Sequence, residues 1–502
     1  MQTKSLGVLV SYFTLFLSSI MSIIITPLMI DSMGLIEFGL YHTITSFIGV
    51  VSILDFGTSI AVTRYTSKYR ISDKLGKINS FLGVAIIINS IIALFIAMFG
   101  FIMILNIDNL FSGGFDYNNI VKAKYIAILY ISSIIITLFT NIFSGVLIGF
   151  EKYVLANCLI LLKLISRYVI IILLLYFNYG AISITAADLL SSGLFLIISY
   201  MFVIKKTGVS PIYSVFKISF IIDVLGFSLA LFLQSVVNQI NNSFEKVLLG
   251  SLIGGEAVAV FSIAISIYLI YGSLSGAIKN VMLPKAVEIT SKDFSTKSIT
   301  NFVSETGRIQ FIVLFYVLCG FILLGKDFLI LWLGNGYEDA YYISLIIMIP
   351  LTLQLSQNVT ETVLDAMGKR LFRSLILLVG AVLNIFISKV LILKYSVYGA
   401  ALAVAANSVV FNLILLNIYH KYTIKLNVLL SFSRILSKTW LCGLISMLLI
   451  YEIGKFIIDP MSRFFILGIA YTFVYILSLF FLELSKSEKT QVSTFLNRLF
   501  SR

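Results

Sequence analysis

The chain has 502 residues, of which 59% are hydrophobic and only 12% are charged. A soluble domain of average composition is nearer half apolar and a quarter charged, so this chain has too little polar surface to cover itself in water. The composition excludes an ordinary soluble protein and predicts one whose solvent is the lipid bilayer.

The net charge of +13 does not indicate nucleic-acid binding, because the basic residues lie in short segments between apolar runs and not on one basic face. The chain contains no phosphate-binding loop of the nucleotide hydrolases. Its three cysteines and two histidines do not form a cluster with metal-ligand spacing. We therefore expect no metal, no cofactor and no nucleic-acid partner.

About fourteen runs along the chain are long and apolar enough to cross a bilayer, which requires about 20 residues. In chain order they cover residues 8–30, 38–60, 79–105, 123–146, 154–177, 182–204, 224–249, 257–281, 308–333, 340–364, 372–393, 399–419, 436–454 and 462–482. The segments between them are too short to form a catalytic domain with its own core. We expect an all-α integral membrane protein that is not an enzyme.

The distribution of Lys and Arg predicts the orientation of these spans. If the N-terminus is inside, the inside segments hold roughly three times as many Lys and Arg residues as the outside ones. We therefore expect both termini to be cytoplasmic.

Two halves of the chain resemble each other. Residues 149–181 match residues 368–400 at an offset of 219, with the same Gly-to-Gly interval, and a weaker match relates residues 34–41 to residues 254–261. Both halves enter the membrane in the same direction, which makes them parallel repeats related by an axis along the membrane normal. We expect two six-helix lobes, 1–217 and 218–425, facing a central cavity, and two additional helices with a cytoplasmic tail in 426–502.

Charged residues inside apolar spans are costly, so they usually face a cavity or a partner. Lys163 and Arg167 are four residues apart and lie on one face of the fifth span. If the fifth and sixth spans fold back on each other at the turn near Tyr179, Asp188 comes within reach of either basic residue. Two interpretations remain open: an ion pair that holds the lobe together, or a cationic cavity wall with a counter-charge.

Five further charged residues are weaker candidates. Lys279, near the inner end of the eighth span, either extends toward the cytoplasm or faces the cavity. Asp55 and Arg64 flank the inner end of the second span, as boundary anchors or as site residues. Glu361 and Asp365 are four residues apart near the inner end of the tenth span. We expect them either to bind a cation or to cap the loop.

Several motifs, in this order, resemble a known family. They occupy residues 33–41, 54–57, 64–65, 248–250, 283–284, 331–334, 366–369 and 398–400. Together they resemble bacterial polysaccharide flippases of the Wzx type, in the multidrug/oligosaccharidyl-lipid/polysaccharide exporter superfamily. The resemblance covers nearly the whole chain.

The resemblance implies two lobes that open alternately to either side of the bacterial inner membrane. It implies a substrate, an undecaprenyl-diphosphate-linked oligosaccharide for O-antigen or another surface polysaccharide, and possible partners in a polysaccharide polymerase and a chain-length regulator. Lys163, Arg167, Lys279 and Arg64 would bind the anionic headgroup, and Asp188, Asp55, Glu361 and Asp365 would be charge partners or coupling groups. The lipid II flippases of this superfamily carry arginines in the first helix, whereas residues 8–30 here hold no charge, which disfavours the peptidoglycan precursor.

Two other functions remain as alternatives. A cation-coupled multidrug exporter of the same superfamily would favour acidic and aromatic residues in its cavity, whereas the deepest charges of the N-terminal half are two bases and one acid. A membrane polysaccharide polymerase or glycosyltransferase would need a sizeable outer loop with catalytic residues.

Overall fold

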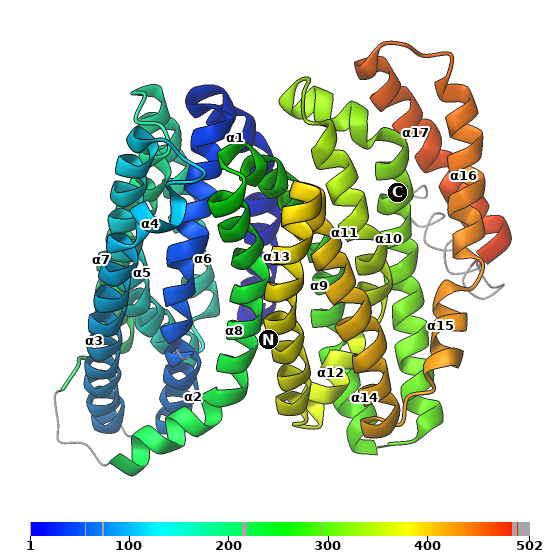
Figure 1. The fold of residues 1–502 in the computed structure, drawn as a ribbon. Helices are drawn as coiled ribbons and strands as arrows, with labels where there is room; N and C mark the ends of the chain where they lie inside the picture. Colours follow the sequence, from blue (N-terminus) through cyan, green and yellow to red (C-terminus); the bar gives the residue numbers. More distant parts are fainter. Residues whose placement is uncertain are drawn as a thin grey trace. The chain divides into compact units, whose positions relative to one another are not determined.

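The protein is all-helical over the described residues, which are 2–55, 57–72, 75–212, 218–292, 294–483 and 489 in this computed structural model (Figure 1). Its chain divides into two compact units. One comprises residues 1–262 with 377–400, and the other comprises residues 263–376 with 401–502. The lobes predicted from the repeat follow different boundaries and stay a prediction, and their first junction, at 217, lies outside the described residues.

The first unit is built from long helices that belong to its N-terminal stretch. They are α1 (Gln2–Gly49), the short 3-10 helix η1 (Val50–Asp55), α2 (Thr58–Ile71), α3 (Leu75–Leu105), α4 (Ile107–Phe111), α5 (Tyr117–Gly149), α6 (Tyr153–Tyr176), α7 (Ile182–Thr207) and α8 (Ile218–Leu252), followed by the start of α9 (Gly255–Lys292) and residues 377–400 of α13 (Arg370–Asn407).

The second unit begins within α9 and contains the C-terminal helices. They are α10 (Thr296–Leu333), α11 (Glu338–Ser356), α12 (Val359–Ala366), both ends of α13, the π-helix η2 (Ser408–Leu415), α14 (Leu416–Thr423), α15 (Val428–Leu436), α16 (Thr439–Gly454), α17 (Pro460–Ser478) and the π-helix η3 (Leu479–Glu483). The C-terminal pair α16 and α17 packs on α10, where Tyr471 and Tyr475 donate hydrogen bonds to the carbonyl oxygens of Tyr316 and Ile312.

Eleven helical stretches among the described residues are long and apolar enough to cross a membrane. Two of them, Leu9–Ile71 and Arg370–Thr423, each turn at a residue with positive φ, Gly34 (75°) and Ser396 (52°), and so contain two predicted spans each. With α8, each of the fourteen predicted spans overlaps a helical stretch, and the span 340–364 crosses the break between α11 and α12. The prediction of an all-α, multi-pass membrane protein is confirmed.

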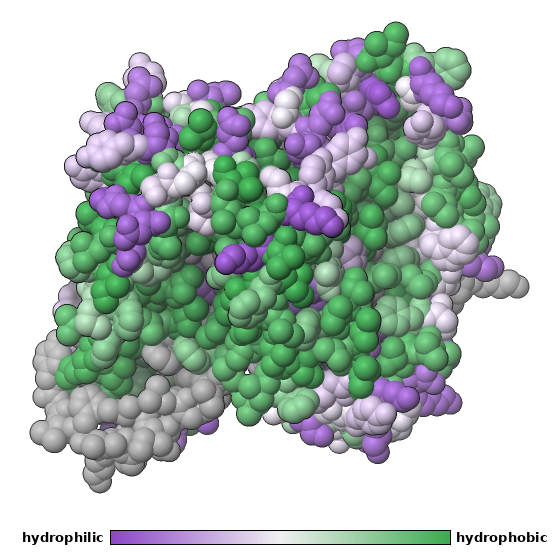
Figure 2. Space-filling view, viewed as in Figure 1, coloured by the Kyte–Doolittle hydropathy of each residue, from purple (hydrophilic) through white to green (hydrophobic). Residues whose placement is uncertain are grey.

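The surface of the molecule fits this class. On the face drawn in Figure 2, hydrophobic residues cover the middle stretches of the helices and hydrophilic residues gather toward the helix ends. On α3, the side chains of Leu94, Phe101 and Leu105 are more than half exposed, which water would penalise and lipid does not.

The helices α2 and α5 of the first unit pack closely, with small residues at their interface. Ser59, Thr63 and Ser67 on α2 are spaced four apart, and each donates a hydrogen bond to the carbonyl oxygen 82 positions later, on Asn141, Gly145 and Gly149, at 2.9, 3.2 and 3.3 Å. A Cβ atom on Gly145 would lie 2.8 Å from the carbonyl oxygen of Ser59. In a membrane, helices associate through this kind of close backbone approach and hydroxyl bonding, because lipid is as apolar as their side chains.

Corresponding glycines of the proposed repeat share positive φ in one pair and differ in the other. Gly34 and Gly254, paired at an offset of 220, both have positive φ, of 75° and 124°. Gly180 turns at φ 56°, whereas its counterpart Gly399 stays in the helix and packs directly against the backbone of Leu391. Gly399 is therefore required for close packing and Gly180 for its left-handed conformation.

Candidate functional site

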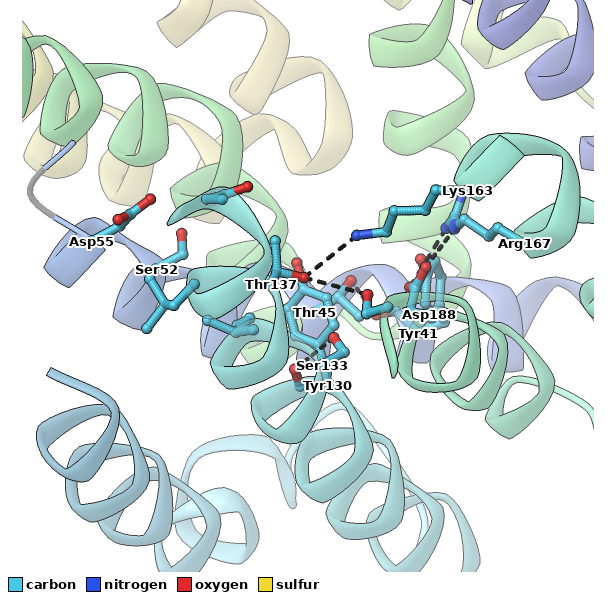
Figure 3. A pocket seen from close by; sticks show the side chains of 14 residues that line it. Tyr41, Thr45, Ser52, Asp55, Tyr130, Ser133, Thr137, Lys163, Arg167 and Asp188 are labelled. Atoms are coloured by element: carbon cyan, nitrogen blue, oxygen red, sulfur yellow. Dashed lines mark hydrogen bonds and ion pairs between the residues drawn. The ribbon is translucent and has the colours of Figure 1, made fainter. Parts of the chain in front are cut away.

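The helix α5 carries a polar stripe on one face. Tyr130, Ser133, Thr137 and Asn141 follow one another at intervals of three or four residues, so they lie on the same side of the helix. This face lines a cavity of about 490 Å³ inside the first unit (Figure 3). A cavity of this size falls in the range of small-ligand sites, about 300–1,000 Å³.

Four other elements of the same unit complete the lining. They contribute Tyr41 and Thr45 from α1, Ser52 and Asp55 from η1, Lys163 and Arg167 from α6, and Asp188 and Ser192 from α7. Hydroxyl groups and charged groups outnumber hydrophobic side chains on these walls, which is unusual inside a chain of this composition.

Arg167 and Asp188 form an ion pair at one end of the cavity. The Arg167 Nε donates to Asp188 Oδ1, and its Nη2 lies 3.5 Å from Asp188 Oδ2. The two helices run back on each other from the turn at Asn178–Gly180, so Asp188 comes within reach of the bases on α6, as the sequence predicts. Of the two pairings that the sequence allows for Asp188, the structure adopts the one with Arg167.

Lys163 lies beside this pair but is bonded differently. Its Nζ atom is 3.5 Å from the Thr137 hydroxyl oxygen, which in turn lies 3.3 Å from the Ser192 hydroxyl. Figure 3 shows the Lys163 side chain reaching toward Thr137 and away from Asp188. No ion pair of Lys163 occurs among the residues that the structure describes. Its ammonium group therefore has one long hydrogen bond, to a neutral hydroxyl, and it can donate to an anion in the cavity.

Asp55 occupies the end of the cavity opposite to these bases (Figure 3). It is the last residue of η1, and the Thr58 hydroxyl donates to its Oδ1 at 2.9 Å. The break in the helix at this point is sharp, because Gly57 has a left-handed φ of 67°. Asp55, which the sequence offers as a boundary anchor or a site residue, thus lines the cavity.

The other predicted residues do not line this cavity. Arg64 lies on α2 with an exposed side chain. Lys279, Glu361 and Asp365 belong to the second unit, where Lys279 and Arg373 both donate to Glu361, and Arg370 donates to Asp365 from two nitrogens. Lys279 is therefore bound to a carboxylate within its own unit and does not extend freely to water. The carboxylates of Glu361 and Asp365 are each neutralised by arginine.

Sequence reasoning missed the uncharged part of the site. The uncharged polar residues that were not predicted are Tyr41, Thr45, Ser52, Tyr130, Ser133, Thr137, Asn141 and Ser192. The spacing of the polar residues on α5 was a signal for four of them. Polar side chains are costly in lipid, so a polar stripe on an apolar span indicates that this face contacts polar groups or a cavity. Among the described residues, no group of three or more His, Cys, Asp or Glu is placed to hold a metal ion.

Comparison with known families and proteins agrees with the fold. The family described as polysaccharide biosynthesis protein matches residues 6–290, more than half of the chain. The capsular polysaccharide biosynthesis protein CapF of Staphylococcus aureus is 28% identical over 234 residues, which cover 43% of this chain and 57% of CapF. The uncharacterized membrane protein MJ1068 of Methanocaldococcus jannaschii is 21% identical over 95% of this chain and 94% of its own length.

Two solved structures share the fold at low sequence identity. The lipid II flippase MurJ in an inward closed conformation superposes with a TM-score of 0.71 at 19% identity, covering 98% of this chain and all of that one. An inward-facing multidrug resistance MATE family transporter superposes with a TM-score of 0.67 at 17% identity, covering 82% of this chain and 95% of that one. Both similarities concern the fold alone.

Proposed function

Because this chain belongs to the polysaccharide biosynthesis protein family, we propose that it is a flippase that moves a lipid-linked oligosaccharide across the membrane. The substrate is an undecaprenyl-diphosphate-linked repeat unit of O-antigen, capsule or another surface polysaccharide. It passes from the cytoplasmic to the periplasmic leaflet of the bacterial inner membrane by alternating access, with both termini of the protein in the cytoplasm. A polymerase and a chain-length regulator would use the product.

The observation that carries this proposal is the bonding of Lys163 in the cavity. A diphosphate cannot enter an apolar interior without compensation for its lost hydration. Lys163 offers an ammonium group that forms no ion pair with a described carboxylate, and Arg167 stands beside it with Asp188 as counter-charge. Charge-assisted hydrogen bonds from such bases to phosphate oxygens are the strong type. The name of the CapF relative supports a surface polysaccharide as the final product.

A second candidate function is cation-coupled export of drugs. Two carboxylates, Asp55 and Asp188, also line the cavity, and the fold is shared with a multidrug resistance transporter. A cationic drug would need a free carboxylate, and Asp188 is already bound to Arg167. Asp55 is the carboxylate in the cavity that such a drug would bind, because it forms no ion pair with a described base.

Deletion and complementation of the gene test the proposal. Cells without the protein should accumulate lipid-linked repeat units on the inner leaflet and lose surface polysaccharide. A Lys163→Ala variant should fail to restore the polysaccharide although it reaches the membrane, whereas Lys205→Ala, an exposed residue at the end of α7, should restore it. Unchanged polysaccharide with increased drug sensitivity in the deletion strain would favour the exporter instead.

A further inference from the structure

The cavity in the first unit has two chemically different ends. Lys163 and Arg167 lie at one end and Ser52 and Asp55 at the other, with Thr137 between them (Figure 3). A phosphate group has only acceptor oxygens and a negative charge, so it fits the basic end and is repelled by the carboxylate. The acidic end must therefore receive a different chemical group.

The carboxylate of Asp55 is held in place by its surroundings. Thr58, at the start of α2, donates to Asp55 Oδ1 at 2.9 Å, and the next residue, Ser59, donates to the carbonyl oxygen of Asn141 on α5 at 2.9 Å. This second bond ties the start of α2 to the polar stripe. Within the described part of the chain, no ion pair involves Asp55. The Asn141 side chain also hydrogen-bonds the Asp55 carboxylate. Because a carboxylate has about four lone-pair sites, it can still accept further hydrogen bonds from a ligand.

The hydroxyls of Ser52 and of the middle of the cavity also leave acceptors for a ligand (Figure 3). Ser52 donates its proton to the carbonyl oxygen of Gly49 at 2.6 Å, and Thr45 donates to that of Tyr41 at 2.7 Å. Ser133 donates to the carbonyl oxygen of Tyr130 at 2.8 Å. Since each hydroxyl has one proton and two lone pairs, these groups can only accept from a ligand. With Asp55, these hydroxyls make the acidic end and the middle of the cavity rich in acceptors. Such walls suit a ligand rich in donors, such as the hydroxyls and amide N–H of a sugar.

We propose that the acidic end, with Asp55 at its centre, binds the sugar bonded directly to the diphosphate, while Lys163 at the other end binds the phosphates. This inference rests on the proposed flippase function. At about 490 Å³, the cavity has room for the phosphates with a sugar next to them and not for an oligosaccharide of several sugars. The site therefore recognises the first sugar and the junction to the lipid, and leaves the rest of the repeat unit outside its walls.

Binding of two lipids to the purified full-length protein tests the inference. The probes are undecaprenyl diphosphate and undecaprenyl-diphosphate-linked N-acetylglucosamine, titrated in detergent by microscale thermophoresis. Lys163→Gln should weaken binding of both lipids about tenfold, because both carry the phosphates. Asp55→Asn should weaken only the sugar-bearing lipid, also about tenfold, and should leave bare undecaprenyl diphosphate bound at least as tightly as before. Asp108→Asn, an exposed acid between α3 and α5, is the matched control and should change neither affinity.

The possible results separate the inference from the proposed function. Equal weakening of both lipids by Asp55→Asn, or no effect on either, would overturn the sugar subsite while leaving the flippase function intact. Failure of the wild-type protein to bind either lipid would overturn the proposed function itself. If Asp55→Asn does not accumulate, Ser52→Ala replaces it, with a smaller loss expected for the sugar-bearing lipid alone. Equal binding of both lipids by the wild-type protein would also contradict the subsite.

Discussion

Arg167 on α6 donates hydrogen bonds to both carboxylate oxygens of Asp188 on α7, while Lys163, one turn earlier on α6, is bonded only to a threonine hydroxyl. Two basic residues on one helix face therefore have different surroundings. The first is held in a pair that joins two helices, and the second is available to a ligand. This difference predicts that their substitution has different consequences.

Substitution of Arg167 by Ala should lower the amount of protein in the membrane. It leaves the partly buried Asp188 without its partner, at a cost of about 1–3 kcal/mol. Exchanging the two residues, Arg167→Asp with Asp188→Arg, should restore the abundance, and Arg167→Lys should rescue in part because Lys lacks the bidentate fork. Quantitative immunoblotting of membranes measures the abundance. Normal abundance of Arg167→Ala would contradict a structural role for the pair.

Lys163→Ala should show the opposite behaviour. Its partner Thr137 keeps a second hydroxyl contact with Ser192, so no charged group is stranded and abundance should stay normal. Transport of lipid-linked oligosaccharide into proteoliposomes should nevertheless fall by at least tenfold, because the unneutralised base is lost. Normal transport by Lys163→Ala would remove this residue from the site.

The α2–α5 contact predicts a sharp difference between two glycines. Gly145→Ala places a Cβ atom 2.8 Å from the carbonyl oxygen of Ser59, which forces the helices apart and should cost about 1–3 kcal/mol. Gly193→Ala on α7 is the control, since nothing lies within 4 Å of its new Cβ. Thermal unfolding of the purified proteins in detergent should show a lower Tm for the first variant only. An equal Tm for both would contradict the close approach of α2 and α5.

In the second unit, Glu361 should be needed for stability. It accepts hydrogen bonds from Lys279 and Arg373, and Arg373 is only 7% exposed. Glu361→Gln leaves this arginine without a counter-charge, which should cost about 3 kcal/mol. Combining Glu361→Gln with Arg373→Met should be milder than the single change, because the buried arginine is removed and only the more exposed Lys279 loses its partner. Glu288→Gln, which breaks an exposed pair with Lys292, should leave the Tm unchanged.

The predicted orientation can be tested by reporter fusions. A fusion at Lys297, just inside α10, should report the cytoplasm, and one at Asn118, at the start of α5, should report the periplasm. A third fusion, at Lys74, should also report the cytoplasm and lies outside the described residues. The reverse pattern would overturn the orientation that the Lys and Arg distribution predicts.

The sequence by itself determined the class of the protein, the positions of its spans and the helix hairpin that brings Asp188 close to two bases. These depend on local properties: about 20 apolar residues make a span wherever they occur, and a short turn brings neighbouring helices to the same level. For this reason the chain alone brings Asp188 within reach of Arg167 or Lys163, and the structure pairs it with Arg167, 21 positions earlier.

Only the tertiary structure decided which charges face a cavity. Asp55 reaches the cavity because Ser59, Thr63 and Ser67 attach α2 to α5 over a separation of 82 residues, and Lys279 meets Glu361 over the same separation. Such contacts depend on how helices pack against one another, and a hydropathy pattern carries no information about the partner of a given helix face. The polar walls of the site, from Tyr41 to Ser192, exist as one surface only after the helices have packed.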